Sequence, residues 1–210
     1  MEFKLSLAFA TPYYNWISVP YHRSMLGIAN TFRPMGIKTS LFGIDRTNSV
    51  QARNNLMKRF MEKNQTEKFD WIFHIDSDMV FTPSHVISLI RDAVKYNLPL
   101  LSGVYFQRRE IGDKRHPVAL RRRNEDSYDC LEGLPESGLI EVDSVGQGFV
   151  VCKPEVYEKL QEKHGNHVFE YVSTKAGMKS EDIVWCERLK ALGFKIMVDC
   201  DVRVGHYGVI

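Results

Sequence analysis

Two carboxylates stand two residues apart, directly after an apolar stretch. Asp76 and Asp78 flank Ser77, and the preceding run 69–75 is rich in aromatic and β-branched residues, which predicts a buried strand. Side chains at positions i and i+2 of an extended chain point the same way, so both carboxylates can converge on one hard cation. An ion held by one or two carboxylates often completes its shell with substrate phosphates. The pattern indicates metal-dependent nucleotide chemistry, whereas an isolated Asp-x-Asp more often marks an acidic strand end.

Two later segments carry residue types that suit such a site. His206 follows the last predicted strand and offers an imidazole ligand, which Mn²⁺ tolerates better than Mg²⁺ does; alone, it would be read as a surface histidine. Glu181 and Asp182 follow Ser180 at a predicted helix start, where the helix dipole favours acidic residues in any case. Backbone donors there tend to keep a carboxylate ionised. An ionised carboxylate that faces a cleft can act as a general base.

A fourth segment, Gly146-Gln147-Gly148, places two glycines around one polar residue. Glycines at this spacing allow a tight turn and a close approach of the backbone to a ligand. The segment lacks the lysine of a phosphate-binding loop and the full dinucleotide-binding fingerprint, so it specifies little by itself.

Alternating strands and helices are expected to position these segments, which favours an α/β fold with a mostly parallel sheet. The helix that begins with Thr82 as its N-cap is expected to bury Val86, Ile87, Ile90 and Val94. Residues 107–138 are irregular and rich in arginine, and they predict either a functional lid or a solvated basic loop. The predicted strands cover 3–10, 39–44, 69–74, 100–106, 139–142, 149–152 and 194–204, and the other helices cover 21–32, 50–63, 154–163 and 180–192.

Bulk properties exclude several classes of protein. A chain of 210 residues with 44% apolar and 26% charged residues fits one globular domain, and a net charge of +2 argues against bulk binding to nucleic acid or acidic membranes. No run of about 18 apolar residues exists that would span a membrane. The four cysteines form no Cys-x-x-Cys pair, which predicts reduced thiols in a cytoplasmic protein and no zinc site.

Taken in order, the four segments resemble the motifs of the GT-A glycosyltransferases, and the resemblance extends from Thr11 to His206. It implies a single GT-A domain over residues 1–210, with a mixed, mostly parallel central sheet flanked by helices. More narrowly, the chain resembles the small N-terminal glycosyltransferase domain encoded by a large chlorella virus. That likeness implies a piece of a longer polypeptide, further domains of which would be partners, and a location in the host cytoplasm.

The resemblance also implies a role for individual residues. Asp182 would be the catalytic base of an inverting transfer, and Asp76, Asp78 and His206 would hold Mn²⁺, with Mg²⁺ as the alternative ion. Gly146, Gln147, Gly148 and Glu181 would face the acceptor, a glycan or glycoprotein. The nucleotide-sugar donor, a UDP-sugar by the same likeness, would contact Thr11, Pro12, Tyr13, Asp45, Arg53, Asp76, Ser77 and Asp78.

Other interpretations of the same residues stay open. An apolar strand followed by Asp-x-Asp also begins the haloacid-dehalogenase phosphatases, for which Lys175 or Lys179 would have to supply the activating lysine. A nucleotide-sugar-binding module without transferase activity is a third possibility. Arg53 is either a solvated charge on its helix or a partner of the diphosphate or of Asp76. Trp185 is expected to pack in the core.

Overall fold

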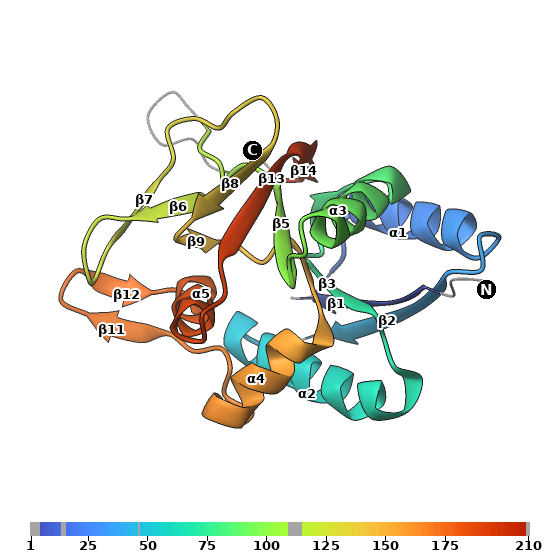
Figure 1. Cartoon of the computed structure of the whole chain (residues 1–210), viewed down its shortest axis with the longest axis horizontal. Helices are drawn as coiled ribbons and strands as arrows, with labels where there is room; N and C mark the ends of the chain where they lie inside the picture. The colour runs from blue at the N-terminus through green and yellow to red at the C-terminus, as the bar shows by residue number, and fades with distance from the viewer. Residues whose placement is uncertain (1–4, 14–15, 46, 109–114, 209–210) are drawn as a thin grey trace.

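The computed structural model describes residues 5–13, 16–45, 47–108 and 115–208. Its centre is a seven-stranded sheet with the strand order β2–β1–β3–β10–β5–β13–β8 (Figure 1). The pairs β1–β2, β1–β3 and β5–β13 are parallel, and the other three are antiparallel. The strands are β1 Ser6–Pro12, β2 Lys38–Ile44, β3 Trp71–Ile75, β5 Leu100–Val104, β8 Leu139–Val142, β10 Phe149–Cys152 and β13 Ile196–Arg203.

The predicted mixed sheet is confirmed, but its pairing is less parallel than expected. Five strands share one direction, yet half of the pairings are antiparallel, because β10 inserts between β3 and β5 and β8 pairs antiparallel with β13 at the edge. Short apolar strands such as 149–152 carry no signal for their direction, so the sequence could not reveal this insertion.

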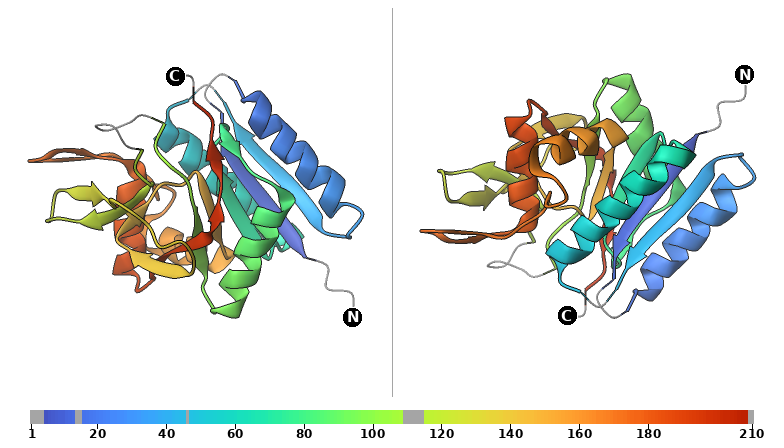
Figure 2. Two further views of the ribbon diagram at one scale, coloured as in Figure 1. Left: turned by 90° about the horizontal axis from the view of Figure 1, so that it is seen from above. Right: turned by 90° about the horizontal axis from the view of Figure 1, so that it is seen from below.

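Helices cover both faces of the sheet (Figure 2). Helices α1 (Val19–Phe32) and α3 (Pro83–Lys95) lie on one face, and α2 (Ser49–Glu67), α4 (Pro154–His164) and α5 (Glu181–Ala191) lie on the other. Each strand supplies alternate residues to the two cores, as its pleat requires. In β1, for example, Leu7 and Phe9 pack beneath α1 and α3, whereas Ala8 and Ala10 pack against the α2 side.

The predicted buried face of helix α3 is correct in part, since Val86 and Ile90 are buried as predicted. Ile87 and Val94, which the sequence pattern predicts to be buried, are 38% and 62% exposed. The helix is rotated so that positions i, i+3, i+4 and i+7 face inward, which is the usual apolar stripe. The buried residues of this stripe are Val86, Leu89, Ile90 and Ala93.

Part of the predicted irregular segment 107–138 is regular. Strands β6 (Ala119–Arg122) and β7 (Tyr128–Cys130) form an antiparallel hairpin, and β6 also pairs with β9 (Ser144–Val145). These strands are short and mostly polar, so they lack the apolar alternation that predicts a strand. The hairpin and a second one, β11 (Val172–Thr174) with β12 (Gly177–Lys179), extend to the same side of the molecule (Figures 1 and 2). The described residues 123–127 and 131–138 are irregular, as predicted, and residues 109–114 of the segment lie outside the described residues.

Two of the bulk predictions can be compared with the structure. All four cysteines are free, as predicted. Within the described part of the chain, no helix is both long enough and apolar enough to cross a membrane.

Asp199 gives stability a measurable pH dependence. Its side chain is buried, and burial together with the neighbouring Asp92 raises the pKa of Asp199 from 3.8 to about 6. Between about pH 4 and 6 the folded state therefore binds more protons than the unfolded state, so stability falls as pH rises through this window. We expect Asp199→Asn to stabilise the protein by about 1–2 kcal/mol at pH 7.5 and to have little effect near pH 4. Urea unfolding at both pH values measures this.

The exposed Glu162 on α4 provides the control, because Glu162→Gln should change stability little at either pH. An Asp199→Asn effect that is the same at pH 4 and pH 7.5 would contradict the expectation.

Candidate functional site

One cleft of about 460 Å³ collects most of the predicted site residues. It lies where β1 and β3 end, between these strand ends and the first turns of α2 and α5. The two strands are parallel neighbours, so their carboxyl ends meet at one edge of the sheet, where α/β folds usually bind ligands. The cleft is lined by Pro12, Tyr13, Trp16, Thr47, Ser49, Ala52, Arg53, Asp76, Ser77, Asp78, Arg108, Glu181 and Asp182.

The Asp-Ser-Asp segment is a turn and not an extended strand, which corrects the geometric premise of its prediction. Strand β3 ends at Ile75, and the Met79 N–H donates to the Asp76 carbonyl at 3.1 Å. In a turn the side chains at i and i+2 no longer share a direction. Asp76 accordingly contacts Arg53, whereas Asp78 faces His206 and Arg108.

Pairing of two short strands places His206 beside Asp78. Strand β14 (Gly205–His206) runs antiparallel to β4 (Met79–Val80), and the Tyr207 N–H donates to the Asp78 carbonyl at 2.8 Å. The Nδ1 atom of His206 lies 2.8 Å from the carbonyl oxygen of Phe106. Because a carbonyl only accepts hydrogen bonds, Nδ1 carries the proton, and Nε2 of the neutral ring is an acceptor.

Two acceptor atoms, Nε2 of neutral His206 and Oδ1 of Asp78, face each other, so a proton or a cation between them would be favourable. Nε2 of His206 and Oδ1 of Asp78 are 3.5 Å apart, both buried and both without a hydrogen-bond partner. A proton on Nε2 satisfies the pair. Burial is the largest single influence and lowers the pKa of His206, but the interactions with Asp78 and with the Phe106 carbonyl together outweigh it and raise the pKa. A divalent ion satisfies the pair equally well, because ligands of an octahedral ion lie about 3 Å apart. The carbonyl of Phe106 fixes the ring as metal-bound histidines require.

The three predicted metal ligands are not assembled as a set. Within the described parts of the chain, no group of three or more His, Cys, Asp or Glu side chains is close enough to hold a metal ion. Asp78 and His206 come together, but Asp76 is directed toward Arg53, with Oδ1 3.1 Å from Nη2. Two protein ligands suffice for an ion that also binds substrate phosphates.

Arg53 is the centre of a buried charge cluster and not a solvated charge on its helix. It is 4% exposed, and Nη2 lies 3.1 Å from Asp76 Oδ1 and 3.7 Å from Asp182 Oδ1. Its Nε atom lies 3.5 Å from Oε1 of Glu181. One guanidinium therefore fixes carboxylates from β3 and α5 together, and it links the predicted metal motif to the predicted base.

The protonation of Asp182 differs from the expected one. Burial raises the pKa of Asp182 to about 7, and Glu181 and Asp76 contribute in the same direction, whereas Arg53 opposes them. The prediction that donors at the helix start keep this carboxylate fully ionised is wrong, because burial outweighs them. A base is most effective when its pKa lies near the working pH, so the shift suits proton transfer. Oδ1 of Asp182 is buried and has no hydrogen-bond partner.

Aromatic side chains form the opposite end of the cleft. Tyr13 and Trp16 both line it, and Trp16 is 54% exposed. The Tyr13 ring packs directly on Gly43 of β2, where an added Cβ would lie 2.3 Å from the ring. Its N–H donates to the Ile44 carbonyl at 2.7 Å. The Tyr13 ring is thus held in the wall of the same cleft as Asp76, where an aromatic face suits the stacking of a nucleobase.

Two predicted donor residues lie outside the cleft. Thr11 is fully buried, and its hydroxyl pairs with that of Tyr21 at 2.7 Å, behind the cleft wall. Asp45 is exposed at the end of β2 and is not one of the lining residues. Of the predicted donor residues in these two segments, Pro12 and Tyr13 line the cleft, and their contact with a donor stays a prediction. Trp185 is fully buried, as predicted.

The glycine segment packs against a tyrosine and does not line the cleft. Gly148 donates its N–H to the Tyr105 hydroxyl at 2.9 Å, and a Cβ at Gly146 would lie 2.2 Å from that hydroxyl oxygen. Gln147 is fully buried, with no hydrogen-bond partner for its side-chain amide. The glycines thus permit close packing around Tyr105, and the predicted contact with an acceptor stays a prediction.

We expect Gly146→Ala to destabilise the protein by about 1–3 kcal/mol, because the Tyr105 ring and Val118 leave no space for a methyl group. Thermal unfolding measures the effect. Gly133→Ala is the matched control, since a Cβ at Gly133 meets nothing within 4 Å. Equal melting temperatures for the two variants would show that the Tyr105 contact does not restrict Gly146.

Comparisons with known proteins bear on the fold alone. The chain has a mixed α/β fold with a large mixed sheet flanked by helices. No family model matches the sequence, and no curated protein matches it. Among solved structures, the crystal structure of A197 from STIV is similar, with a TM-score of 0.62 and 16% sequence identity over 98% of this chain and 86% of that chain.

Several cleft residues, among them Trp16, Thr47, Ser49 and Arg108, were not assigned a role from the sequence. Trp16 belongs to the aromatic run that begins at Pro12, and this run was the available signal. Arg108 is one of several arginines in the segment 107–138, and nothing in the sequence distinguishes it from the others. Its contact with Asp78 depends on the strands that bring residues 78, 106 and 206 together.

Proposed function

We propose that the chain is a GT-A-type glycosyltransferase that moves a sugar from a nucleoside diphosphate, a UDP-sugar, to an acceptor hydroxyl on a glycan or glycoprotein. The observation that carries this proposal is the convergence of three kinds of group on one cleft. The aromatic rings of Tyr13 and Trp16 suit a base, Asp78 of the cleft with the neighbouring His206 suits a metal ion with a diphosphate, and Asp182 suits proton transfer. A GT-A domain is one form of the mixed α/β fold described above.

In this proposal Asp182 is the catalytic base. Its unpartnered Oδ1 accepts the proton of the acceptor hydroxyl, while the Arg53 guanidinium holds the carboxylate in place. Asp76 and Glu181 both lie closer to Arg53 than Asp182 does, which leaves Asp182 as the base in this proposal. Attack of the acceptor on the face opposite the leaving group then gives inversion at the anomeric carbon. Tyr13 and Trp16 hold the nucleoside.

The metal site in this proposal consists of Asp78 and His206, whose unpartnered atoms fit Mn²⁺, or Mg²⁺ with a weaker preference for the imidazole. When bound, the ion neutralises the charge that develops on the leaving diphosphate. Asp76 acts in the same site through Arg53, which it keeps beside the diphosphate position.

The phosphatase alternative has less support from the geometry. Lys179 pairs with Glu187 at 2.8 Å, and neither it nor Lys175 lines the cleft. Asp76, which would have to be the nucleophile, is engaged by Arg53. The binding-module alternative leaves the raised pKa of Asp182 without a use.

A thermal-shift screen of nucleotide sugars with and without Mn²⁺ tests the proposal. We expect stabilisation by a nucleotide sugar only when Mn²⁺ is present, with the size of the shift following ligand concentration. Hydrolysis of simple phosphate esters with Mg²⁺ provides the parallel test of the phosphatase alternative. No shift with any donor plus metal would reject the transferase function. Location in a host cytoplasm and membership of a longer polypeptide are further parts of the proposal, which this screen does not address.

A further inference from the structure

Arg108 pairs with the carboxylate of Asp78, which is also the proposed ligand of the metal ion that binds the diphosphate. Its Nη2 atom lies 2.9 Å from Oδ2 of Asp78, and His206 faces the other oxygen of the same group. The Asp78 side chain is 9% exposed, so a negative charge there needs a close positive partner. In this structure the guanidinium provides that charge.

The backbone just before Arg108 is held by contacts with a neighbouring segment, whereas the Arg108 side chain is exposed. The preceding residue, Gln107, donates its N–H to the His116 carbonyl at 2.9 Å, and Phe106 forms a bridge with Pro117. The Arg108 side chain itself is 52% exposed and lines the cleft that contains Asp182. A long side chain with a fixed backbone and an exposed guanidinium can change its partner without a change of fold.

A divalent ion on Asp78 and His206 would compete directly with this guanidinium. Two cations on one carboxylate repel each other, and among the described residues Asp78 is the carboxylate within ion-pair distance of Arg108. A bound diphosphate changes the balance, because it brings several negative charges into the cleft that Arg108 already lines. Guanidinium groups bind phosphate oxygens in a bidentate manner.

We propose that Arg108 is a diphosphate-binding residue that pairs with Asp78 only while the metal ion is absent. This inference rests on the proposed function of the cleft. Metal and diphosphate then bind with positive cooperativity, because each one favours the conformation of Arg108 that the other requires. A metal ion alone must displace Arg108, whereas a metal ion with a diphosphate gives Arg108 a new partner.

The test measures binding and not turnover. Calorimetry on the full chain gives the affinity for Mn²⁺ alone, and for uridine diphosphate with and without Mn²⁺. We expect Arg108→Ala to bind Mn²⁺ alone about two- to fivefold more tightly, because a competing, partly exposed ion pair is lost. The same variant should bind uridine diphosphate in the presence of Mn²⁺ about tenfold more weakly, because a charge-assisted contact is lost. Opposite signs exclude general misfolding, which would weaken both affinities.

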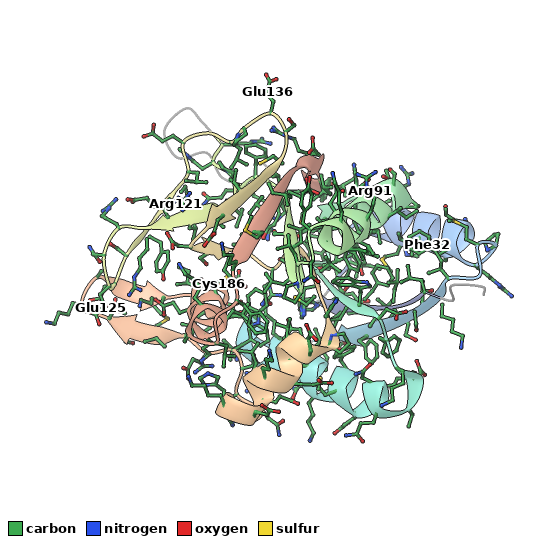
Figure 3. All side chains as sticks on the ribbon, viewed as in Figure 1. Phe32, Arg91, Arg121, Glu125, Glu136 and Cys186 are labelled. Carbon is green, nitrogen blue, oxygen red and sulfur yellow. The ribbon has the colours of Figure 1, made fainter. Side chains whose placement is uncertain are left out.

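Arg121→Ala is the matched control, since Arg121 is an exposed arginine on β6 and does not line the cleft (Figure 3). It should leave both affinities unchanged, and Arg108→Lys, which keeps the charge, should bind Mn²⁺ alone as the wild type does. If the wild type binds both ligands and Arg108→Ala does not tighten Mn²⁺ binding, the role of Arg108 is wrong and the proposed function stands. If the wild type binds neither ligand, both the proposed function and this inference are wrong.

Discussion

Asp182→Asn is expected to bind a nucleotide sugar normally and to lose about 10²–10⁴-fold in transfer rate, the range that a positioned base contributes. Asparagine has the shape of aspartate but cannot accept the proton of an acceptor hydroxyl. We expect donor binding to be retained, because Oδ1 of Asp182 has no hydrogen-bond partner and lies 3.7 Å from Nη2 of Arg53. Steady-state transfer assays give the rate, and calorimetry with the nucleotide gives the affinity.

The matched control for this prediction is Glu155→Gln. Glu155 is an exposed acidic residue in the first turn of α4, as Asp182 is in the first turn of α5, so both changes alter the helix dipole interaction in the same way. Transfer by Glu155→Gln should equal that of the wild type. Normal turnover by Asp182→Asn would assign proton transfer to another group.

The pH dependence of transfer should follow the same carboxylate. With the pKa of Asp182 raised to about 7, the base is largely protonated at pH 6 and largely ionised at pH 8. The rate of the wild type should therefore rise with pH through this interval, and the residual rate of Asp182→Asn should not show that rise. Measurement of the transfer rate of both enzymes over the same pH range distinguishes the titration of Asp182 from any titration of the acceptor.

Arg53→Met is expected to destabilise the protein by about 3–5 kcal/mol, because it leaves the carboxylates of Asp76, Glu181 and Asp182 without their shared cation. For a chain of this size the melting temperature should fall by about 10 °C. The loss of stability should grow as pH rises. Without Arg53 the buried carboxyl groups have higher pKa values in the folded state, so their ionisation at higher pH destabilises the fold. Thermal unfolding at pH 5 and pH 8 measures both effects.

Arg59→Met on the same helix is the control, because Arg59 is exposed and its substitution should change stability by less than about 0.5 kcal/mol. Adding Glu181→Gln to Arg53→Met should restore part of the lost stability, since one uncompensated charge is removed. An Arg53→Met protein as stable as Arg59→Met would show that the cluster does not need its guanidinium.

Local patterns were sufficient to predict most elements but not their arrangement. Helix α4 begins at Pro154, as its sequence indicates, and β8 and β10 have the predicted bounds. The antiparallel insertion of β10 and the hairpin β6–β7 were missed, because strand direction and polar edge pairing are decided by contacts distant in sequence.

In the candidate site, too, local patterns predicted individual residues but not the contacts between distant segments. Residue types at strand and helix ends pointed to Asp78 and Asp182, and the family resemblance added Pro12; all three line one cleft. The separation of Asp76 from Asp78 was not predictable, because a turn and an extended strand end look alike in three residues of sequence. The function of Arg108 depends on a neighbour a hundred residues away, His206, and no local pattern contains that information.

The insertion of β10 has a consequence for the order in which the chain folds. One edge of β3 pairs with β1, which precedes it closely in the sequence. The other edge pairs with β10, residues 149–152, where Val150 lies opposite His74. Contacts of such long sequence separation close slowly, because a large loop must be ordered first. During synthesis, Asp76 and Asp78 therefore acquire their rigid support only after about two thirds of the chain has left the ribosome, and β3 keeps an unpaired edge open to other strands until then.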